Sequence, residues 1–321
     1  MKSVASALAL ALTLAPCIAS GQAAHGELSS LKGNVARIDA GDRTGFGFIV
    51  GLADRAVLIA TAWHTLRGMT VDSVTVCFPL RGETCGRGSV AYIADAIGSQ
   101  PALDLAIVRA DYPEGLVWRP DVLAERPGNG EPLWFIGRSR DWYIPNDAGR
   151  ASAFDPAKQL VSYRELQVAE GVSGAPIVSR QGVVAMHVES VGGDGEARGV
   201  DIHAIRSRVI EGLRAQWALV PRAECDTQSA HARVLSGRNV VVHFDGRRAS
   251  VGLDAIARLN CLGARGIPRP VWSTDAWAGN GIAYGSGELR AARALQSVLV
   301  AHGRLDTRLA DAEGGLEIWL R

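Results

Sequence analysis

The sequence predicts a mainly β protein, in which two six-stranded antiparallel β-barrels are followed by a small α/β domain. Short apolar runs punctuated by Gly, Pro and Asp fill residues 30–110 and recur over residues 131–202, as in antiparallel β-structure. Beyond Pro221 strand-like and helix-like segments alternate, which is typical of α/β structure. The chain has 321 residues, more than one hydrophobic core usually serves, so we expect separate domains.

Six strands are expected in the first part of the chain, enough to close one barrel. They either alternate apolar and polar residues or run apolar throughout. The strands are Asn34–Ile38, Gly45–Val50, Ala56–Ala60, Ser73–Phe78, Gly88–Ala94 and Leu105–Arg109. A linker rich in Pro and Gly, Arg119–Glu131, follows them.

A second set of strands predicts the second barrel. These strands are Glu131–Ile136, Leu160–Gln167, Ala175–Val178, Gly182–Val188 and Gly199–Ile202. The segment Ile202–Trp217 then carries apolar residues at helical spacing, so it predicts an amphipathic helix that packs on the barrel.

Residues 224–321 predict a separate α/β module. Its expected strands are Asn239–Phe244, Val271–Ser273, Gly281–Gly285 and Gly315–Leu320, and its expected helices are Val251–Asn260 and Glu288–Gly303. His243, Asp245 and Asp306 are chemically capable, but the sequence assembles no partners around them, so we expect structural roles. The module's position suggests docking to another protein or to the cell envelope, and the alternative is a stabilising appendage on the second barrel.

Composition excludes several classes of function. A hydrophobic share of 47% and a charged share of 21% describe an ordinary globular protein. The formal net charge of +1 offers no basic face for a nucleic-acid partner. No C-x-x-C or H-E-x-x-H spacing is present, so we expect no metal site and no cofactor.

The N-terminus has the layout of a secretory signal. Lys2 precedes an apolar run from Val4 to Leu14, and small residues follow up to Ala23. The run is too short to cross a bilayer, so residues 1–24 predict a cleaved signal peptide, a secreted or periplasmic protein and no transmembrane segment. A proline directly before Cys17 argues against lipidation of that cysteine.

Export would explain the remaining four cysteines, because disulfides persist in oxidising compartments. Cys77 and Cys85 flank a turn-rich segment that could close a hairpin, and Cys225 and Cys261 both lie in the C-terminal part. Pairing within each part, Cys77–Cys85 and Cys225–Cys261, is the simplest of three connectivities. Four buried free thiols are the alternative.

Three short runs place chemically capable residues among small or apolar ones. His64 follows Thr61-Ala62-Trp63, Asp104 opens an apolar run, and Ser173 lies in Gly171-Val172-Ser173-Gly174-Ala175-Pro176. A serine hydroxyl needs a base within hydrogen-bond reach, and the base needs a carboxylate to fix its tautomer. The order His, Asp, Ser is that of double β-barrel serine peptidases rather than of α/β-hydrolases or subtilisin-like enzymes.

Around these runs the chain resembles the trypsin-like (chymotrypsin-fold) serine peptidases, in particular their compact bacterial branches. Thr44–Val50 is similar to the family's Gly-rich strand, and Val57–His64 to its histidine strand and turn. Asp104–Val108 and Gly171–Pro176 are similar to its aspartate strand and nucleophile loop. The resemblance covers about residues 30–215 and implies a peptidase domain over residues 25–218, with its active site in the cleft between the barrels.

The resemblance implies a role for each matching residue. Ser173 would attack the scissile carbonyl, His64 would accept and return its proton, and Asp104 would orient His64. The backbone N–H groups of Gly171 and Ser173 would form the oxyanion hole. Val172 departs from the aspartate that many members use to bind a new N-terminus after zymogen cleavage, so that activation switch is not expected.

The resemblance implies the residues that select the substrate less clearly than it implies the catalytic residues. Gln167 resembles the base of the primary pocket, and His187 and Glu189 resemble its side strand. A histidine at a position like His187 occurs in the glutamate-cutting branch, where it could pair with an acidic substrate side chain. Two residues argue against that specificity here: Val168 stands where that branch has a hydroxyl residue that helps, and Glu189 would repel an acidic side chain. A hydrogen-bonded strand residue is the alternative for His187.

The sequence thus predicts an exported serine endopeptidase that acts on polypeptides through an acyl-enzyme. One alternative is a catalytically silent binding protein on the same fold. Another is an unrelated esterase, but the run from Gly171 to Ala175 fails the G-x-S-x-G elbow at its last position.

Overall fold

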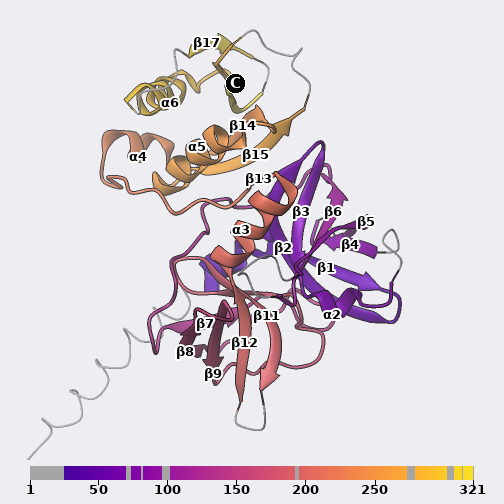
Figure 1. Ribbon diagram of the computed structural model, residues 1–321. Helices are drawn as coiled ribbons and strands as arrows, with labels where there is room; N and C mark the ends of the chain where they lie inside the picture. The colour runs from indigo at the N-terminus through magenta and orange to yellow at the C-terminus, as the bar shows by residue number, and fades with distance from the viewer. Residues whose placement is uncertain are drawn as a thin grey trace, which may run out of the picture.

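The computed structural model describes residues 25–69, 74–80, 82–95, 102–191, 195–272, 279–301, 307–312 and 314–320. Two β-barrels lie side by side, and an α/β region lies at one end of the molecule (Figure 1). The expected signal peptide over residues 1–24 lies outside the described residues, as do Ser73, Ser273 and Asp306. No helix of the described segments is both long enough and apolar enough to cross a membrane.

The first barrel consists of six antiparallel strands and closes where β1 pairs with β2. The apolar run that precedes His64 forms β3, which is buried at every position. The strands are β1 (Val35–Ala40), β2 (Arg43–Ala53), β3 (Ala56–Thr61), β4 (Val74–Phe78), β5 (Thr84–Ile93) and β6 (Ala106–Asp111), and the short helices are η1 (Lys32–Asn34) and α2 (Trp63–Leu66).

The second barrel is also six-stranded and antiparallel, and it closes where β7 pairs with β10. Its strand β11 is buried over its first six positions, which are apolar except for His187. The backbone of His187 bonds to the nucleophile loop. The strands are β7 (Pro132–Phe135), β8 (Gly149–Asp155), β9 (Leu160–Arg164), β10 (Pro176–Val178), β11 (Val183–Val191) and β12 (Glu196–Asp201).

Helix α3 (Ile202–Leu213) joins the two barrels. It contacts β2 and β5 of the first barrel and β11 and β12 of the second, and it buries Ile205 and Val209 of the predicted apolar stripe. Ile210 of that stripe is exposed, and the helix expected over residues 202–217 has Leu213 as its last residue. The helix ends at Arg214, whose φ of 50° is left-handed. The chain then forms β13 (Gln216–Trp217), which extends the first barrel's sheet by pairing with the end of β2.

The C-terminal region has a five-stranded sheet in the order β15-β14-β18-β16-β17, with parallel and antiparallel pairs. Helix α5 packs on β14 and β15, α6 packs on β16, and α4 packs against α6. The elements are α4 (Ala230–Leu235), β14 (Asn239–Asp245), α5 (Ala249–Cys261), β15 (Arg265–Val271), β16 (Gly281–Tyr284), α6 (Leu289–Ala301), β17 (Arg308–Asp311) and β18 (Leu316–Leu320).

Hydrogen bonds fasten the C-terminal region to the segment that follows β6. They run from Tyr112 Oη to Pro268 O, from Arg269 Nη1 to Leu116 O and from Asn260 Nδ2 to Asp121 Oδ1, over 3.3, 3.0 and 2.8 Å. Asp121 is almost fully buried and also pairs with Arg119 at 2.6 Å. The edge strand β15 is therefore covered rather than left open to pair with another chain.

The elements that the sequence analysis missed have weak or contradictory signals. β8 is rich in Gly, Ala and Ser, which have little β-propensity. β15 contains Pro268 and Pro270, which the sequence rules place outside central strands, but it lies at the sheet edge, where proline is tolerated. Of the extended stretch expected over residues 271–273, Val271 is the last residue of this longer strand, Trp272 follows the strand, and Ser273 lies outside the described residues.

Two disulfides are present, Cys77–Cys85 and Cys225–Cys261. The first joins neighbouring strands of the first barrel. The second joins the chain that enters the C-terminal region to the last residue of α5. These are the pairs that the sequence analysis favours.

Candidate active site

His64 is held at the end of a buried strand. Its helical turn α2 begins two residues after β3 ends, so the rigid barrel fixes the position of its backbone. The backbone N–H of His64 donates to Asp104 Oδ1 at 2.8 Å, and Arg43 Nη1 donates to the carbonyls of His64 and Arg67 at 2.9 and 3.0 Å. These contacts fix the direction in which the imidazole leaves the chain.

A line of polar atoms connects both barrels. Asp104 Oδ2 lies 2.5 Å from His64 Nδ1, and His64 Nε2 lies 2.8 Å from Ser173 Oγ. An ionised carboxylate can only accept a hydrogen bond, so Nδ1 carries the imidazole proton and Nε2 is free to accept the serine proton. The His64 and Asp104 side chains remain 41% and 34% exposed, so solvent and substrate can reach them.

Asp104 stays ionised because of its partners. Burial raises the pKa of this carboxyl group, but hydrogen bonds and coulombic attraction from His64, helped by Arg67, outweigh that effect and lower the pKa below its usual value. An ionised Asp104 stabilises the imidazolium that forms when His64 takes up a proton.

The loop that carries Ser173 is clamped by both barrels. The Ser173 carbonyl accepts from Phe46 N of β2 at 2.8 Å, and Gly174 N donates to His187 O of β11 at 2.9 Å. Thr61 Oγ1, which is buried, donates to Phe46 O at 2.7 Å and supports the first clamp. The position of the hydroxyl is therefore set by the contact between the barrels.

Glycine is required on both sides of Ser173. Gly171 has φ +78°, and a Cβ there would lie 2.9 Å from Ser139 Cα. Gly174 has φ +81°, and a Cβ there would lie 2.0 Å from Phe46 O. Among the described residues, neither Gly171 N nor Ser173 N donates to a backbone carbonyl, so both N–H groups remain available to an oxyanion.

His187 lies behind the nucleophile loop as a neutral imidazole. Tyr163 Oη is 2.5 Å from its Nδ1, and both side chains are buried. Burial, with a smaller contribution from His64, lowers the pKa of His187 to about 4. Burial raises the pKa of Tyr163 well above its usual value, so the phenol keeps its proton, and its Oη lies 2.5 Å from His187 Nδ1 and 3.5 Å from Arg198 O. In the tautomer in which the phenol donates to the nearer Nδ1, the imidazole proton is on Nε2.

The other two residues expected in the primary pocket lie at the surface. Gln167 is exposed in the segment between β9 and β10. Glu189 is exposed on β11 and pairs with Arg198 of the neighbouring β12 at 3.3 Å. Of the three, His187 is the one with a direct backbone contact to the nucleophile loop.

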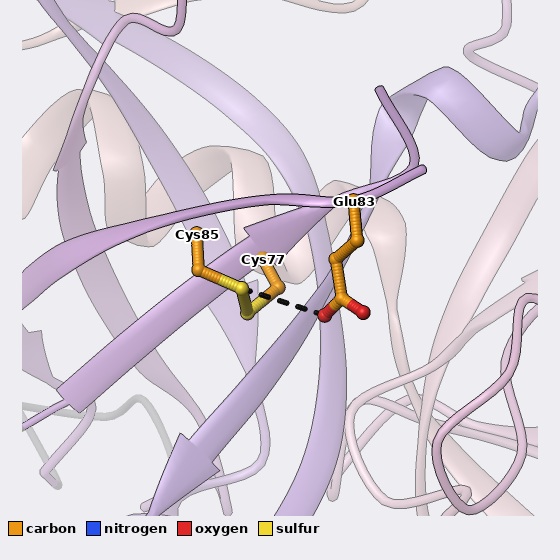
Figure 2. Close-up of side chains that lie close together, drawn as sticks. All are labelled: Cys77, Glu83 and Cys85. Carbon is orange, nitrogen blue, oxygen red and sulfur yellow. Dashed lines mark hydrogen bonds between the residues drawn. A yellow bond between two sulfur atoms is a disulfide. The ribbon is translucent and has the colours of Figure 1, made fainter. Parts of the chain in front are cut away.

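A group of three potential metal ligands in the described chain brings together Cys77, Glu83 and Cys85 (Figure 2). Its two sulfurs are bonded to each other, and a disulfide sulfur lacks the negative charge of a thiolate ligand. In this oxidised form the group has no thiolate donor for a metal ion.

Sequence reasoning missed the residues that support the candidate site. Tyr163 lies on β9 and reaches His187 only because β9, β12 and β11 are neighbours in the closed barrel. The contact of Phe46 with the nucleophile loop crosses the boundary between the barrels, and Ser139, which follows β7, lies beside the backbone of Gly171. The glycines of the nucleophile loop indicate that another part of the chain approaches its backbone closely, but they do not identify that part.

Residues 45–185 match the family model of the trypsin-like peptidase domain. Among curated proteins none matches this chain. Similar solved structures include the serine endoprotease from Yersinia pestis, with 17% identity over 59% of this chain and 66% of that one and a TM-score of 0.46. They also include the serine protease of a human pathogenic astrovirus (22% identity, 53% and 90% covered, TM-score 0.39) and the MamO protease domain from Magnetospirillum magneticum (18%, 56% and 97%, TM-score 0.43).

The matched segment contains most of both barrels, from β2 into β11. It includes the three residues of the polar line, His64, Asp104 and Ser173. This chain therefore contains a trypsin-like peptidase domain.

Proposed function

We propose that this chain is a serine endopeptidase that hydrolyses peptide bonds through an acyl-enzyme intermediate. The observation that carries the proposal is the continuous line from Asp104 Oδ2 to His64 Nδ1 and from His64 Nε2 to Ser173 Oγ, at 2.5 and 2.8 Å. Such a line gives a serine both a base to accept its proton and a carboxylate to orient that base.

In the first half-reaction Ser173 Oγ attacks the scissile carbonyl while its proton passes to His64 Nε2. Asp104 remains ionised and stabilises the imidazolium. His64 then returns the proton to the leaving amine as the C–N bond breaks. Water then attacks the acyl carbonyl while His64 takes up its proton. The ester C–O bond to Ser173 breaks, His64 returns the proton to Ser173 Oγ, and the acyl group leaves as a carboxylic acid.

The oxyanion of each tetrahedral intermediate is assigned to the N–H groups of Gly171 and Ser173. The left-handed φ of Gly171 and the absence of backbone acceptors for the two N–H groups among the described residues support this role. Donors fixed in advance stabilise charge that appears only in the transition state, which is where such contacts accelerate the reaction.

We assign selection of the side chain before the scissile bond to His187, with Gln167 and Glu189 at the rim. A pKa of about 4 leaves His187 uncharged at neutral pH. A neutral Nε2–H donor suits an uncharged acceptor, such as a glutamine amide, better than a carboxylate, because it offers no positive charge. The Glu189–Arg198 pair at the rim is close to neutral and does not reverse this preference.

The enzyme is proposed to work outside the cytoplasm on polypeptides. The leader-like residues 1–24 support export, and two disulfides fit an oxidising compartment. Residues 224–321 are proposed to be a module that docks to another protein or to the cell envelope.

Profiling with a peptide library tests activity and selectivity together. We expect cleavage by the full chain, and a loss on the order of 10³-fold or more in kcat/KM on changing Ser173→Ala, with an unchanged melting temperature. A correctly folded full chain that cleaves no peptide would point instead to the catalytically silent binding protein. Equal turnover by wild type and Ser173→Ala would remove Ser173 from the mechanism.

The library also tests the pocket. We expect substrates with glutamine before the cleaved bond to be preferred over those with glutamate, and His187→Leu to erase that preference while Ser173 remains reactive. A strong preference for glutamate at pH 7 would contradict a neutral His187.

A further inference from the structure

The Cys77–Cys85 disulfide joins two residues that lie directly opposite each other on neighbouring strands. Cys77 of β4 and Cys85 of β5 are register partners, with their Cα atoms 4.0 Å apart (Figure 2). The bridge therefore closes a hairpin that backbone pairing already forms. Four further register pairs hold β4 to β5 on either side of it.

The two sulfurs of this bridge differ in accessibility. Cys77 is fully buried in the core of the first barrel, whereas Cys85 is exposed. Thiol–disulfide exchange needs a thiolate to reach one sulfur from outside, so access depends on which sulfur faces solvent. In this bridge only Cys85 offers such access.

The two sulfurs also differ in electrostatic surroundings. Arg37 Nη2, on β1, lies 3.5 Å from Cys77 Sγ, and a carboxylate oxygen of Glu83 lies 3.4 Å from Cys85 Sγ. A guanidinium stabilises a thiolate and a carboxylate disfavours one. Arg37 also pairs with Asp39 at 2.8 Å and with Glu83 at 2.7 Å, so its charge is shared between these partners. It is nevertheless the cation beside Cys77 Sγ, whereas a carboxylate lies beside Cys85 Sγ, so Cys77 is the better leaving group of the two.

The second disulfide lacks these features. Cys225 and Cys261 are both half-buried, and Cys225 packs against the hydrophobic core. The residues are 36 apart in sequence, against 8 for the first bridge. Opening a long loop releases more chain entropy than opening a short one, so the native fold depends more on the second bridge.

We propose that Cys85 is a thiol-exchange site, at which an external dithiol reduces the Cys77–Cys85 bridge while the protein stays folded. A thiolate of the dithiol attacks Cys85 Sγ, a new S–S bond forms, and the Cys77–Cys85 bond breaks. Its electron pair leaves on Cys77 Sγ as a thiolate, which Arg37 stabilises.

The second thiol of the dithiol completes the reaction. As a thiolate it attacks the sulfur that its own molecule has attached to Cys85, and Cys85 leaves and takes up a proton from solvent. Two electrons have then passed from the dithiol, which becomes a disulfide, to the bridge. The new Cys85 thiol can donate to Glu83, while Cys77 remains beside Arg37. The step uses no residue of the proposed peptidase mechanism.

The direct test follows both bridges of the full wild-type chain under native conditions. The protein is exposed to limiting dithiothreitol, quenched with an alkylating reagent and mapped by mass spectrometry. We expect Cys77 and Cys85 to be alkylated at least about tenfold faster than Cys225 and Cys261, with unchanged circular dichroism. Equal rates, or faster opening of the second bridge, would overturn the proposal.

A monothiol identifies the attacked sulfur. With glutathione in place of dithiothreitol, the mixed disulfide should form on Cys85 and the alkyl group should appear on Cys77. Adducts mainly on Cys77, or equally on both, would contradict the assignment.

The role of the cation is tested with a matched pair of variants. Arg37→Gln should slow opening of the first bridge about three- to tenfold, and Arg37→Lys should restore most of the rate, because it retains the charge. The rate for Cys225–Cys261 in each variant reports whether the fold is intact. Equal rates for Arg37→Gln and wild type would show that Arg37 does not assist the leaving group.

Discussion

At the scale of single residues, the candidate site places two imidazoles in different surroundings. His64 Nδ1 lies 2.5 Å from Asp104 Oδ2, and its side chain is partly exposed. His187 is buried beside the Tyr163 phenol, and burial lowers the pKa of its imidazole to about 4. A neutral His187 would not repel the imidazolium that the proposed mechanism forms at His64.

His187 predicts a defined acid sensitivity. Its pKa is about 4 in the folded protein against 6.5 in the unfolded chain, so between these values the unfolded state binds more protons. Folding stability should therefore fall as pH drops from about 6.5 to 4, by about 3 kcal/mol for this group. We expect the free energy of unfolding in urea to show this loss for wild type. The His187→Gln variant should lack the part of the loss that His187 causes.

Other groups also titrate in this range. The informative quantity is therefore the difference in the free energy of unfolding between wild type and His187→Gln at each pH. Asp104 has a lowered pKa, so its contribution to stability is present above its usual pKa and is lost at lower pH. A difference between the two proteins that stays constant from pH 7 to pH 4 would show that His187 is not held neutral.

The sequence identifies the three residues of the polar line, but not the residues that support them. His64, Asp104 and Ser173 are found from three runs because each run has a recognisable local pattern. Tyr163 carries no such pattern, because its partner comes from another strand of the same barrel. The close approach of Ser139 to the Cβ position of Gly171 carries no local pattern either, because the two residues are brought together only by the fold.

At the scale of elements, the nucleophile loop works as a clamp between β2 and β11. Its backbone bonds to Phe46 and His187 mean that a shift of either barrel moves Ser173. A rigid two-sided support suits a reaction in which displacement by about 1 Å can cost 10²-fold in rate.

Changing Gly174→Ala tests this clamp. The new Cβ would lie 2.0 Å from Phe46 O and 2.6 Å from Thr61 Oγ1, so the loop must move away from β2. We expect kcat/KM to fall by about 10²-fold. Gly68→Ala is the matched control, because Gly68 also has a left-handed φ of +87° but has open space around its Cβ position. Similar kinetics for the two variants would show that the clamp does not position Ser173.

The sequence predicts strands well where they are strongly apolar and poorly where pairing alone makes them. β3 and β6 are recognisable as apolar runs, because both lie in the core of the first barrel. β8 has few apolar residues, and it forms a strand because it pairs with β7 and β9 in the closed second barrel. β15 is not predicted as a strand because it contains prolines, which an edge strand tolerates.

At the scale of the whole molecule, the C-terminal region lies away from the candidate site. It contacts Tyr112, Leu116 and Asp121, beyond the end of β6, whereas Asp104 precedes the start of that strand. β6 is six residues long, so about 20 Å separates its ends. We therefore expect removal of the region to leave the residues of the polar line in place.

A chain truncated after Arg222 should cleave a short peptide at close to the full rate, but melt at a lower temperature. The lower stability follows because Asp121 loses its bond from Asn260 and the part of β13 that α5 contacts becomes exposed. If the docking role is right, the truncated enzyme should also lose retention on its physiological surface or partner. An insoluble or inactive truncated chain would show that the region belongs to the peptidase fold.

The most direct test of the central claim is labelling with a serine-directed fluorophosphonate, followed by peptide mapping. If Ser173 is a nucleophile activated by His64, wild type should carry one phosphonyl group on Ser173, and His64→Ala should label at least about 10³-fold more slowly. Ser173→Ala should not label at this peptide at all. A folded wild-type chain that leaves Ser173 unmodified, or that labels as fast without His64, would contradict the account.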